Sequence, residues 1–413
     1  MSEFFSHVLS NGLTVLAEVN PYAYSVSQGF FVQTGSQNEQ PFESGVSHFL
    51  EHMFFKGSAR RTADDVNREF DDLGANNNAY TSEDMTVFYA SFLPEFLESV
   101  TDIWSDILRP ALREEDFNSE RQVVIEELKM YEDQPPFGLD DESRAAFFNG
   151  HPLGNSVIGT VESLTGMTPE IMRNYFQRQY SPDNIILCAA GKVDFDQLVK
   201  LAEKYCGNWE PQTRQPIRQP FTPGRVKKSV VEPKAVQQYV LDWGPAPKPE
   251  GRDFYVAKIL GALLGDESGS RFYWELSDPG LAETAQFSYC DYNDAAAFTA
   301  QLACDPDQAN DCLDIISRIY RDVEKNGFSE KELDLCRRRA IAHIAVHEEK
   351  TFARMFAVAA DWIQRKKYLS LDEGIEIIRS IRLEEINQMV KQYPLEPTVR
   401  FAVGPEPLDG EEN

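Results

Sequence analysis

The sequence predicts a two-domain protein that mixes strands and helices, in which the second domain repeats the fold of the first. The chain has 413 residues, enough for about two to four domains of ordinary size. Segments with strand periodicity and segments with helix periodicity follow one another along it. Similar groups of segments recur after roughly 210 residues, and such a period indicates an internal duplication.

The first half opens with signals for a β-hairpin. Two alternating stretches, 5–9 and 13–19, flank Asn11-Gly12, which is a strong turn signal. We expect further strands at 26–34, 78–92 and 185–190, and helices at 44–57, 62–73, 94–107, 113–131 and 167–179.

Three pairs of segments indicate the duplication. They are 88–94 and 298–306, 117–120 (FNSE) and 328–331 (FSEK), and 170–191 and 385–404. Helix and strand ends can look alike by chance, but three pairs in the same order favour duplication. The stretch 209–231 between the halves is rich in proline and has little periodicity. We therefore expect domains at 1–210 and 232–413, joined by a linker at 211–231.

The chain is strongly acidic, with a formal net charge of −27. Nucleic-acid binders are usually basic, so the charge argues against that class of partner. Acidity keeps a protein soluble through self-repulsion, whereas a negative chamber would attract basic peptides. The acidic residues are spread along the chain, which favours the first interpretation.

The cysteines and the N-terminus bear on the compartment. None of the six cysteines forms a CxxC pair and none lies in the first 187 residues, which is no disulfide framework. Residues 1–12 lack a basic region and an apolar core, and no run of 18 apolar residues occurs. We expect no signal peptide, no membrane span and a cytoplasmic location.

The chemistry centres on His48-Phe49-Leu50-Glu51-His52, an HxxEH motif in a predicted helix. Residues i and i+4 share one helix face, so both imidazoles can reach one zinc ion, and Glu51 points to the same place. The alternative is two surface histidines on an amphipathic helix. The helix is mostly apolar around them, and polar groups buried there without a purpose would be costly.

Catalytic zinc needs a third protein ligand and an open position for water. The predicted helix 113–131 offers five carboxylates for this role: Glu114, Glu115, Glu120, Glu126 and Glu127. Zinc would lower the pKa of its water toward ~7, and Glu51 would act as the general base. His343 and His347 are also four residues apart, but they lack an interposed glutamate and read as part of a packed helix.

The segment 45–58 (GVSHFLEHMFFKGS) resembles the signature of the pitrilysin family of metallopeptidases, which includes insulin-degrading enzyme and the mitochondrial processing peptidase. The later segment 78–82 (NAYTS) resembles the family's strand after the helix pair. The resemblance covers nearly the whole chain. It implies an α+β fold of two duplicated domains, each an antiparallel sheet packed with helices, a Zn²⁺ cofactor, and an endopeptidase acting on peptides or unfolded polypeptide segments.

The resemblance also assigns roles to residues. It puts Glu127 on the third metal ligand, together with His48 and His52, and Glu120 on a supporting acidic residue of the catalytic site. In the family, substrate is thought to add as a strand at the edge that here is Asn78, Ala79, Tyr80 and Thr81. Short members of this kind usually pair, so we expect a homodimer, with a heterodimer of related chains as the alternative.

The second half departs from the first. The segment that should match the motif reads VAKILG (256–261), and Arg338 stands where the first half has Glu127. Arg271, in the segment GSRFY, matches a family arginine and is a candidate catalytic residue that clamps substrate; the alternative is an arginine in a surface salt bridge. Glu283 occupies the position of a family tyrosine, for which Tyr289 or Tyr292 could substitute. This departure keeps open a non-catalytic or partner-dependent subunit of a processing-peptidase-like complex.

Overall fold

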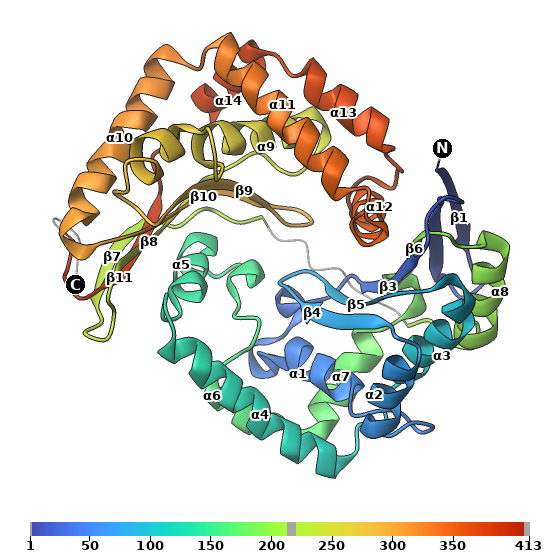
Figure 1. The fold of residues 1–413 in the computed structure, drawn as a ribbon. Coiled ribbons are helices and arrows are strands. Elements are labelled where there is room, and N and C mark those ends of the chain that lie inside the picture. The colour runs from blue at the N-terminus through green and yellow to red at the C-terminus, as the bar shows by residue number, and fades with distance from the viewer. Residues whose placement is uncertain (1, 213–219, 409–413) are drawn as a thin grey trace. The chain divides into compact units, whose positions relative to one another are not determined.

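The computed structural model describes residues 2–212 and 220–408. Their contacts divide them into two compact units, each with its own sheet (Figure 1). Unit 1 comprises 2–130, 155–212 and 346–369, and unit 2 comprises 131–154, 220–345 and 370–408. Each unit therefore contains a segment from the other half of the sequence.

Unit 1 is built on a six-stranded sheet. Its strands follow the order β1 (Glu3–Val8), β2 (Thr14–Val19), β6 (Ile185–Gly191), β3 (Val26–Val32), β5 (Thr86–Phe92) and β4 (Asn76–Thr81). All neighbours are antiparallel except β2 and β6, which run parallel. Strand β4 pairs only with β5 among the described strands, so it forms one edge of the sheet.

The single strand expected at 78–92 is wrong, because the structure has a hairpin of β4 and β5 there. The chain reverses at Ser82–Met85, where the backbone N–H of Ser82 donates to the carbonyl of Met85 over 2.8 Å. The Ser82 hydroxyl also donates to that carbonyl over 3.1 Å. Such local hydrogen bonds from a serine side chain favour a turn, but no Gly, Pro or Asn at 82–85 marks it in the sequence.

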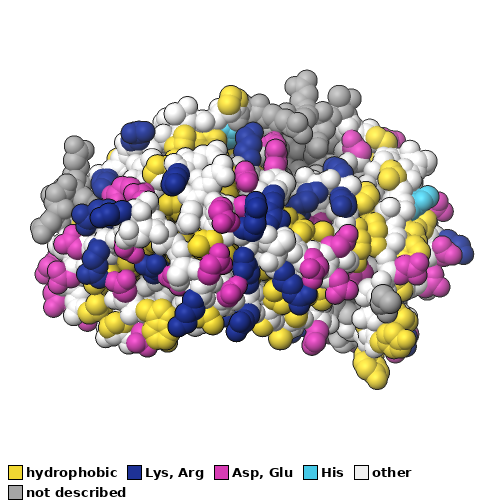
Figure 2. All heavy atoms as spheres, turned by 90° about the horizontal axis from the view of Figure 1, so that it is seen from above, with side chains coloured by type: hydrophobic (Ala, Val, Ile, Leu, Met, Phe, Trp, Pro, Cys, Tyr) yellow, Lys and Arg dark blue, Asp and Glu magenta, His cyan; other side chains and the backbone are white. Residues whose placement is uncertain are grey.

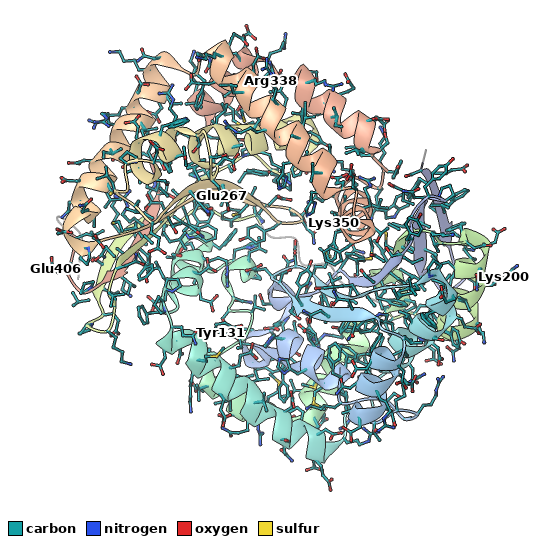
Figure 3. The ribbon with its side chains drawn as sticks, viewed as in Figure 1. Tyr131, Lys200, Glu267, Arg338, Lys350 and Glu406 are labelled. Carbon is teal, nitrogen blue, oxygen red and sulfur yellow. The ribbon has the colours of Figure 1, made fainter. Side chains whose placement is uncertain are left out.

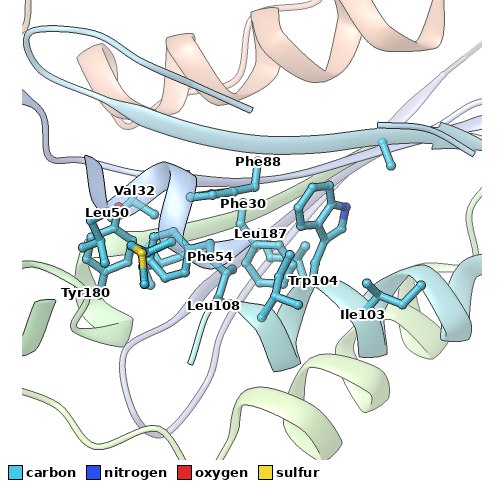
Figure 4. Close-up of a cluster of buried hydrophobic side chains, with 14 of the residues drawn as sticks. Phe30, Val32, Leu50, Phe54, Phe88, Ile103, Trp104, Leu108, Tyr180 and Leu187 are labelled. Atoms are coloured by element: carbon cyan, nitrogen blue, oxygen red, sulfur yellow. The ribbon is translucent and has the colours of Figure 1, made fainter. Parts of the chain in front are cut away.

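One face of the first sheet is covered by helices that share a single hydrophobic core with it. Strand residues Phe30, Phe88 and Leu187 point to this face, where Phe54 of α1 and Trp104 of α3 pack against them (Figure 4). The covering helices are α1 (Val46–Phe54), α2 (Ala63–Asp72), α3 (Leu97–Ile107), α4 (Glu114–Asp133), α6 (Val161–Gly166), α7 (Pro169–Gln179) and α8 (Phe195–Cys206).

The opposite face of the first sheet is covered by α12 (Thr351–Arg365), a helix from the far end of the sequence. Ile186 and Cys188 alternate with Leu187 and contact α12, so β6 is buried on both sides. Arg354 of α12 forms a buried ion pair with Glu18 of β2. Unit 1 therefore depends on a helix that the sequence places after most of unit 2.

Unit 2 repeats this plan. Its sheet has the order β7 (Val226–Val231), β11 (Val399–Gly404), β8 (Gln238–Pro245), β10 (Ala296–Cys304) and β9 (Thr284–Asp291). One face packs on α9 (Gly251–Gly265), α10 (Ala309–Asn326), α11 (Glu330–His347), α13 (Leu371–Ser380) and α14 (Leu383–Gln392). The other face packs on α5 (Leu139–Phe148), which comes from the first half of the sequence.

The two sheets share one topology, since β2, β6, β3, β5 and β4 correspond in order and direction to β7, β11, β8, β10 and β9. The α+β fold of two antiparallel-type sheets packed with helices is therefore confirmed, and the predicted duplication has a counterpart in every one of these strands. Strand β7 lies inside the stretch expected as a linker, and 213–219 of that stretch lie outside the described residues. The boundaries at 210 and 232 stay a prediction.

Short helical segments complete the chain. They are η1 (Ser36–Asn38), η2 (Pro41–Glu43), η3 (Pro94–Phe96), η4 (Pro152–Gly154), η5 (Pro182–Asn184), η6 (Tyr273–Ser277) and η7 (Pro306–Gln308). Among the described residues, none of the helices combines the length and the hydropathy that a membrane span requires.

Candidate metal centre

Helix α1 presents His48, Glu51 and His52 away from the core, because the apolar residues on its other side are buried in the core. The five core residues of α1 are Val46, Phe49, Leu50, Met53 and Phe54, each at most 1% exposed. The imidazole rings of His48 and His52 lie one helical turn apart, with centroids separated by 4.7 Å. The apolar side of α1 thus fixes the direction in which the polar side points.

Glu127 of α4 faces the two histidines. Its Oε1 lies 3.8 Å from His48 Nε2, and its Oε2 lies 3.4 Å from His52 Nε2. One ligand atom from each of the three residues lies within 4.8 Å of the others. In the described part of the chain, no other group of His, Cys, Asp or Glu has this geometry, so His343 and His347 belong to none.

The charges of this cluster fit a cation. Burial works against a charge on His52, but hydrogen bonds to Glu120 and Glu127 outweigh it and raise the pKa of His52 to about 9. Burial and the neighbouring His52 lower the pKa of His48 to about 4. At neutral pH a proton on His52 therefore balances the Glu127 carboxylate. Two imidazole nitrogens and one carboxylate oxygen are also a ligand set of catalytic zinc, which would take the place of that proton.

Glu120 orients the imidazole of His52 by binding the ring nitrogen that faces away from Glu127. The ring Nδ1 of His52 lies 3.0 Å from Glu120 Oε1, which leaves Nε2 pointing at Glu127. Lys56 Nζ lies 2.6 Å from the other Glu120 oxygen. Burial opposes ionisation of Glu120, yet hydrogen bonds from His52 and Lys56 lower its pKa. A carboxylate that holds the second nitrogen of a ligating histidine is a common support of metal sites.

Glu51 is held by Thr81 of the edge strand β4. The Thr81 hydroxyl donates to Glu51 Oε2 over 2.7 Å. Burial raises the pKa of Glu51, and the hydrogen bond from Thr81 opposes part of that effect. A carboxylate whose pKa is raised by burial is a stronger base at neutral pH. The structure thus brings the predicted base beside the three predicted ligands.

The four predicted substrate-binding residues lie on β4. Asn78 is exposed, Ala79 is half-buried against the core, and Thr81 faces Glu51. Tyr80 points to the opposite face, where its ring stacks on Phe356 of α12 at 6.2 Å between centroids. Because β4 pairs only with β5 among the described strands, the backbone N–H and C=O groups along its other side can pair with a further strand.

The predicted second-half residues lie in unit 2. Arg271 Nη1 lies 2.8 Å from Asp322, and its Nε lies 2.7 Å from Glu332. Glu283 accepts a hydrogen bond from Gln237 Nε2 over 2.6 Å. The hydroxyl of Tyr289 donates to the carbonyl of Pro247 over 2.9 Å. Tyr292, the other tyrosine considered for the position of Glu283, packs edge-on against Phe148.

Sequence reasoning missed three contributors to the metal centre. Lys56 lay inside the quoted signature but had no role assigned, and the contact of Thr81 with Glu51 was not foreseen. Glu39, whose carboxylate accepts hydrogen bonds from the backbone at the start of α1, belongs to no motif that the sequence analysis identifies. Each of these contacts depends on tertiary packing, and residue spacing gives no signal for it.

Comparison with known proteins identifies the class of protein. The family described as Insulinase (Peptidase family M16) matches residues 14–161, and the Peptidase M16 inactive domain matches 166–340. The chain therefore belongs to peptidase family M16, and the predicted resemblance is confirmed. The first match contains every proposed ligand, whereas the second reaches into unit 2.

Individual relatives of the chain are named as zinc proteases. The chain is 28% identical over 402 residues to the uncharacterized zinc protease YmxG of Bacillus subtilis, which covers 97% of this chain and 98% of the relative. It is 30% identical over 390 residues to an uncharacterized zinc protease of Mycobacterium leprae, covering 93% and 88%. The chain is thus similar over its length to proteins named as zinc proteases.

Solved structures share the fold. A protease from Helicobacter pylori superposes with a TM-score of 0.91 at 21% identity, covering 98% of this chain and 100% of that one. An M16-like peptidase described as putative, from Alicyclobacillus acidocaldarius, gives 0.86 at 23% identity, covering 98% and 99%. At these identities the likeness establishes the fold and no more.

Proposed function

We propose that the chain is a zinc-dependent endopeptidase that hydrolyses peptides or unfolded polypeptide segments. The observation that carries the proposal is the convergence of His48, His52 and Glu127, with ligand atoms within 4.8 Å of one another, beside Glu51. Membership of family M16 and the relatives named zinc proteases support it.

Each residue of the proposed site has its own role in peptide hydrolysis. A zinc ion held by His48, His52 and Glu127 would supply Lewis acidity, which acidifies a water molecule and polarises a peptide carbonyl. Glu51 takes the proton of the attacking water on its carboxylate and gives it to the leaving amine. Thr81 keeps that carboxylate turned toward the reacting atoms, and Glu120 keeps Nε2 of His52 turned toward the metal.

We place the substrate on the outer edge of β4, along Asn78, Ala79, Tyr80 and Thr81. An added strand pairs through backbone groups, which favours extended peptides over folded proteins. Thr81 belongs to this strand and contacts Glu51, so a peptide paired there lies near the base. On the face in Figure 2, acidic and basic side chains intermingle, which favours solubility as the reason for the net charge.

We further propose that Arg271 clamps the substrate and that two copies of the chain pair. Arg271 is bound to Asp322 and Glu332, which fix its guanidinium in place. The proposed location is cytoplasmic, because no disulfide joins cysteines within the described residues and such cysteines suit a reducing compartment. No nucleic acid or membrane partner is proposed.

A second candidate is a subunit that needs an unlike partner for activity. The observation that favours it is Glu283, a carboxylate where a tyrosine is expected, held by Gln237 in unit 2. Under this alternative the zinc site forms but the chain alone cleaves nothing.

The test compares the wild type with Glu51→Gln on a pool of unfolded peptides, with cleavage followed by mass spectrometry and zinc measured on the same samples. Glu51→Gln should keep its zinc and lose about 100- to 10,000-fold in rate. Glu126→Gln, an exposed carboxylate beside Glu127, is the matched control and should behave as the wild type. A wild type that holds zinc but cleaves nothing, at any concentration that permits pairing, would favour the partner-dependent subunit.

A further inference from the structure

The first turn of α1, which delivers His48, has an unusual cap. Helices commonly begin with a Ser, Thr, Asp or Asn whose side chain accepts a hydrogen bond from the first turn. Helix α1 begins after Gly45, which is left-handed (φ 86°) and has no side chain to do this. The open amide groups of its first turn must therefore find acceptors elsewhere.

Glu39 supplies those acceptors from a distance along the chain. Its Oε2 accepts from the backbone N–H of Gly45 and its Oε1 accepts from the backbone N–H of Ser47, each over 2.8 Å. Glu39 is 4% exposed, and no Lys, Arg or His among the described residues lies within ion-pair distance of it. A buried acidic group without a cation is costly unless its oxygens are hydrogen-bonded, and here both oxygens accept from the backbone at the start of α1.

A second contact holds the same turn. The hydroxyls of Ser47 and Tyr175 are 2.6 Å apart, and Tyr175 also lies 2.9 Å from the hydroxyl of Thr34. Gly45 itself is wedged against another loop, because a Cβ there would lie 2.5 Å from the carbonyl oxygen of Ile158. The residue next to His48 is thus fixed through its backbone and its side chain.

We propose that Glu39 is a positioning residue of the metal centre, which fixes the first turn of α1 so that His48 faces Glu127 before any metal binds. This inference rests on the proposed zinc site. Ligands held in place by a rigid surrounding bind metal more tightly, because less ordering remains to be done on binding. Outer residues of metal sites commonly affect affinity by about 10- to 100-fold.

The experiment measures zinc affinity and does not need activity. Metal-free wild type, Glu39→Gln and Glu43→Gln are titrated with zinc against a competing chromophoric chelator, and each is checked by circular dichroism and thermal unfolding. Glutamine keeps the shape of Glu39 but turns one amide group toward an N–H that needs an acceptor. We expect Glu39→Gln to bind zinc about 10-fold more weakly than the wild type.

Glu43 is the matched control because it lies in the same loop and is 1% exposed, yet it contacts Arg178 and the backbone of Gln40, not α1. Glu43→Gln should lose thermal stability and keep the zinc affinity of the wild type. If Glu39→Gln fails to fold, Ser47→Ala takes its place, with an expected loss of about 3-fold from the same turn.

The outcomes separate the ideas. Wild-type zinc affinity in Glu39→Gln overturns the positioning role and leaves the zinc site intact. Equal losses of affinity in Glu39→Gln and Glu43→Gln, in proportion to their losses of stability, also overturn it, because Glu39 would then be merely structural. A wild type that binds no zinc overturns the metal centre and this inference together.

Discussion

The two units of the chain place a corresponding helix against a corresponding edge strand, and the side chains there differ in kind. In unit 1, α1 lies against β4 and carries His48, Glu51 and His52. In unit 2, α9 lies against β9 and is buried through an apolar run that includes Val256, Ile259 and Leu260. The sheet order is the same, so the scaffold does not decide the chemistry.

The second carboxylate position differs as well. Helix α4 brings Glu127 to the histidines, whereas α11 carries Arg338 at the position matched from the sequence (Figure 3). At the matched positions, the described helices α9 and α11 offer neither the two imidazole nitrogens nor the carboxylate oxygen, and the fixed positive charge of Arg338 would repel a metal ion. A duplicated fold can therefore keep its packing in both copies while only one copy keeps a metal centre.

The largest expected effect comes from giving unit 1 the residue of unit 2. Glu127→Arg should abolish zinc binding, and Glu127→Gln should weaken it by more than about 100-fold, beyond the range for residues outside the ligand set. Metal analysis after dialysis measures both. The reverse change, Arg338→Glu, should add no zinc, because α9 offers no histidine. Full zinc occupancy in Glu127→Gln would mean that another group is the third ligand.

The next effect concerns stability and compares a buried ion pair in each unit. Glu18 and Arg354 link β2 to α12 in unit 1, and Asp242 and Arg400 link β8 to β11 in unit 2. Removing one charge leaves the other buried, which costs about 3–5 kcal/mol. Glu18→Gln and Asp242→Asn should each lower the free energy of unfolding by about this amount in urea. Glu98→Gln, in an exposed pair with Lys204, should leave the urea midpoint unchanged.

That comparison also tests the exchange of helices between the halves. If Glu18→Gln is as stable as the wild type, α12 is not held on the first sheet as described. A loss in Glu18→Gln without one in Asp242→Asn would mean that only unit 1 depends on its buried pair.

A smaller effect should appear in the pH dependence of the metal-free protein. The pKa of His52 is raised to about 9 from an ordinary 6.5, so its contribution is fully present below pH 6.5 and is lost as the pH rises through 9. The pKa of His48 is lowered to about 4, so its contribution is present above pH 6.5 and is lost as the pH falls through 4. Together they place the optimum of this site near pH 6.5.

We expect the free energy of unfolding to fall by about 1–3 kcal/mol between pH 6.5 and 9 in chelator-treated wild type, relative to His52→Gln. Urea titrations at several pH values measure it. Among the described residues of unit 2, no His, Cys, Asp or Glu cluster has the ligand geometry of this site. A parallel pH profile in wild type and His52→Gln would show that the carboxylates do not hold a proton on His52.

The smallest expected effect on stability is that of Arg271→Met. Its ion pairs with Asp322 and Glu332 are partly exposed, and such pairs contribute at most about 1 kcal/mol. If Arg271 clamps the substrate, Arg271→Met should raise the KM for peptide about 10-fold and leave the zinc content of the protein unchanged. Arg318→Met, which loses a more exposed pair with Glu275, is the control. An unchanged KM would limit Arg271 to its ion pairs.

The ligands could be predicted because the helix itself sets the spacing of His48, Glu51 and His52. Spacing alone leaves five carboxylates as candidates on the predicted helix 113–131, and the family resemblance selects Glu127, which the structure places beside both histidines. The contacts of Glu39 and Lys56 could not be predicted, since loop closure and side-chain packing bring them to the site.

Most strands and helices could be predicted from periodicity and turn residues, including the hairpin at Asn11-Gly12. The turn at Ser82–Met85 is not predicted, because no Gly, Pro or Asn marks it in the sequence. The sequence does not predict that α5 packs on the second sheet and α12 on the first, because an apolar helix face can pack on either sheet.

The central claim is that one zinc ion per chain is held by His48, His52 and Glu127, and X-ray absorption at the zinc edge with metal counting tests it most directly. The claim predicts one zinc per chain, surrounded by nitrogen and oxygen at about 2.0–2.2 Å with the signature of two imidazoles, and this signal should vanish in His52→Ala. A shell containing sulfur at about 2.3 Å, or zinc retained in His52→Ala, would contradict it.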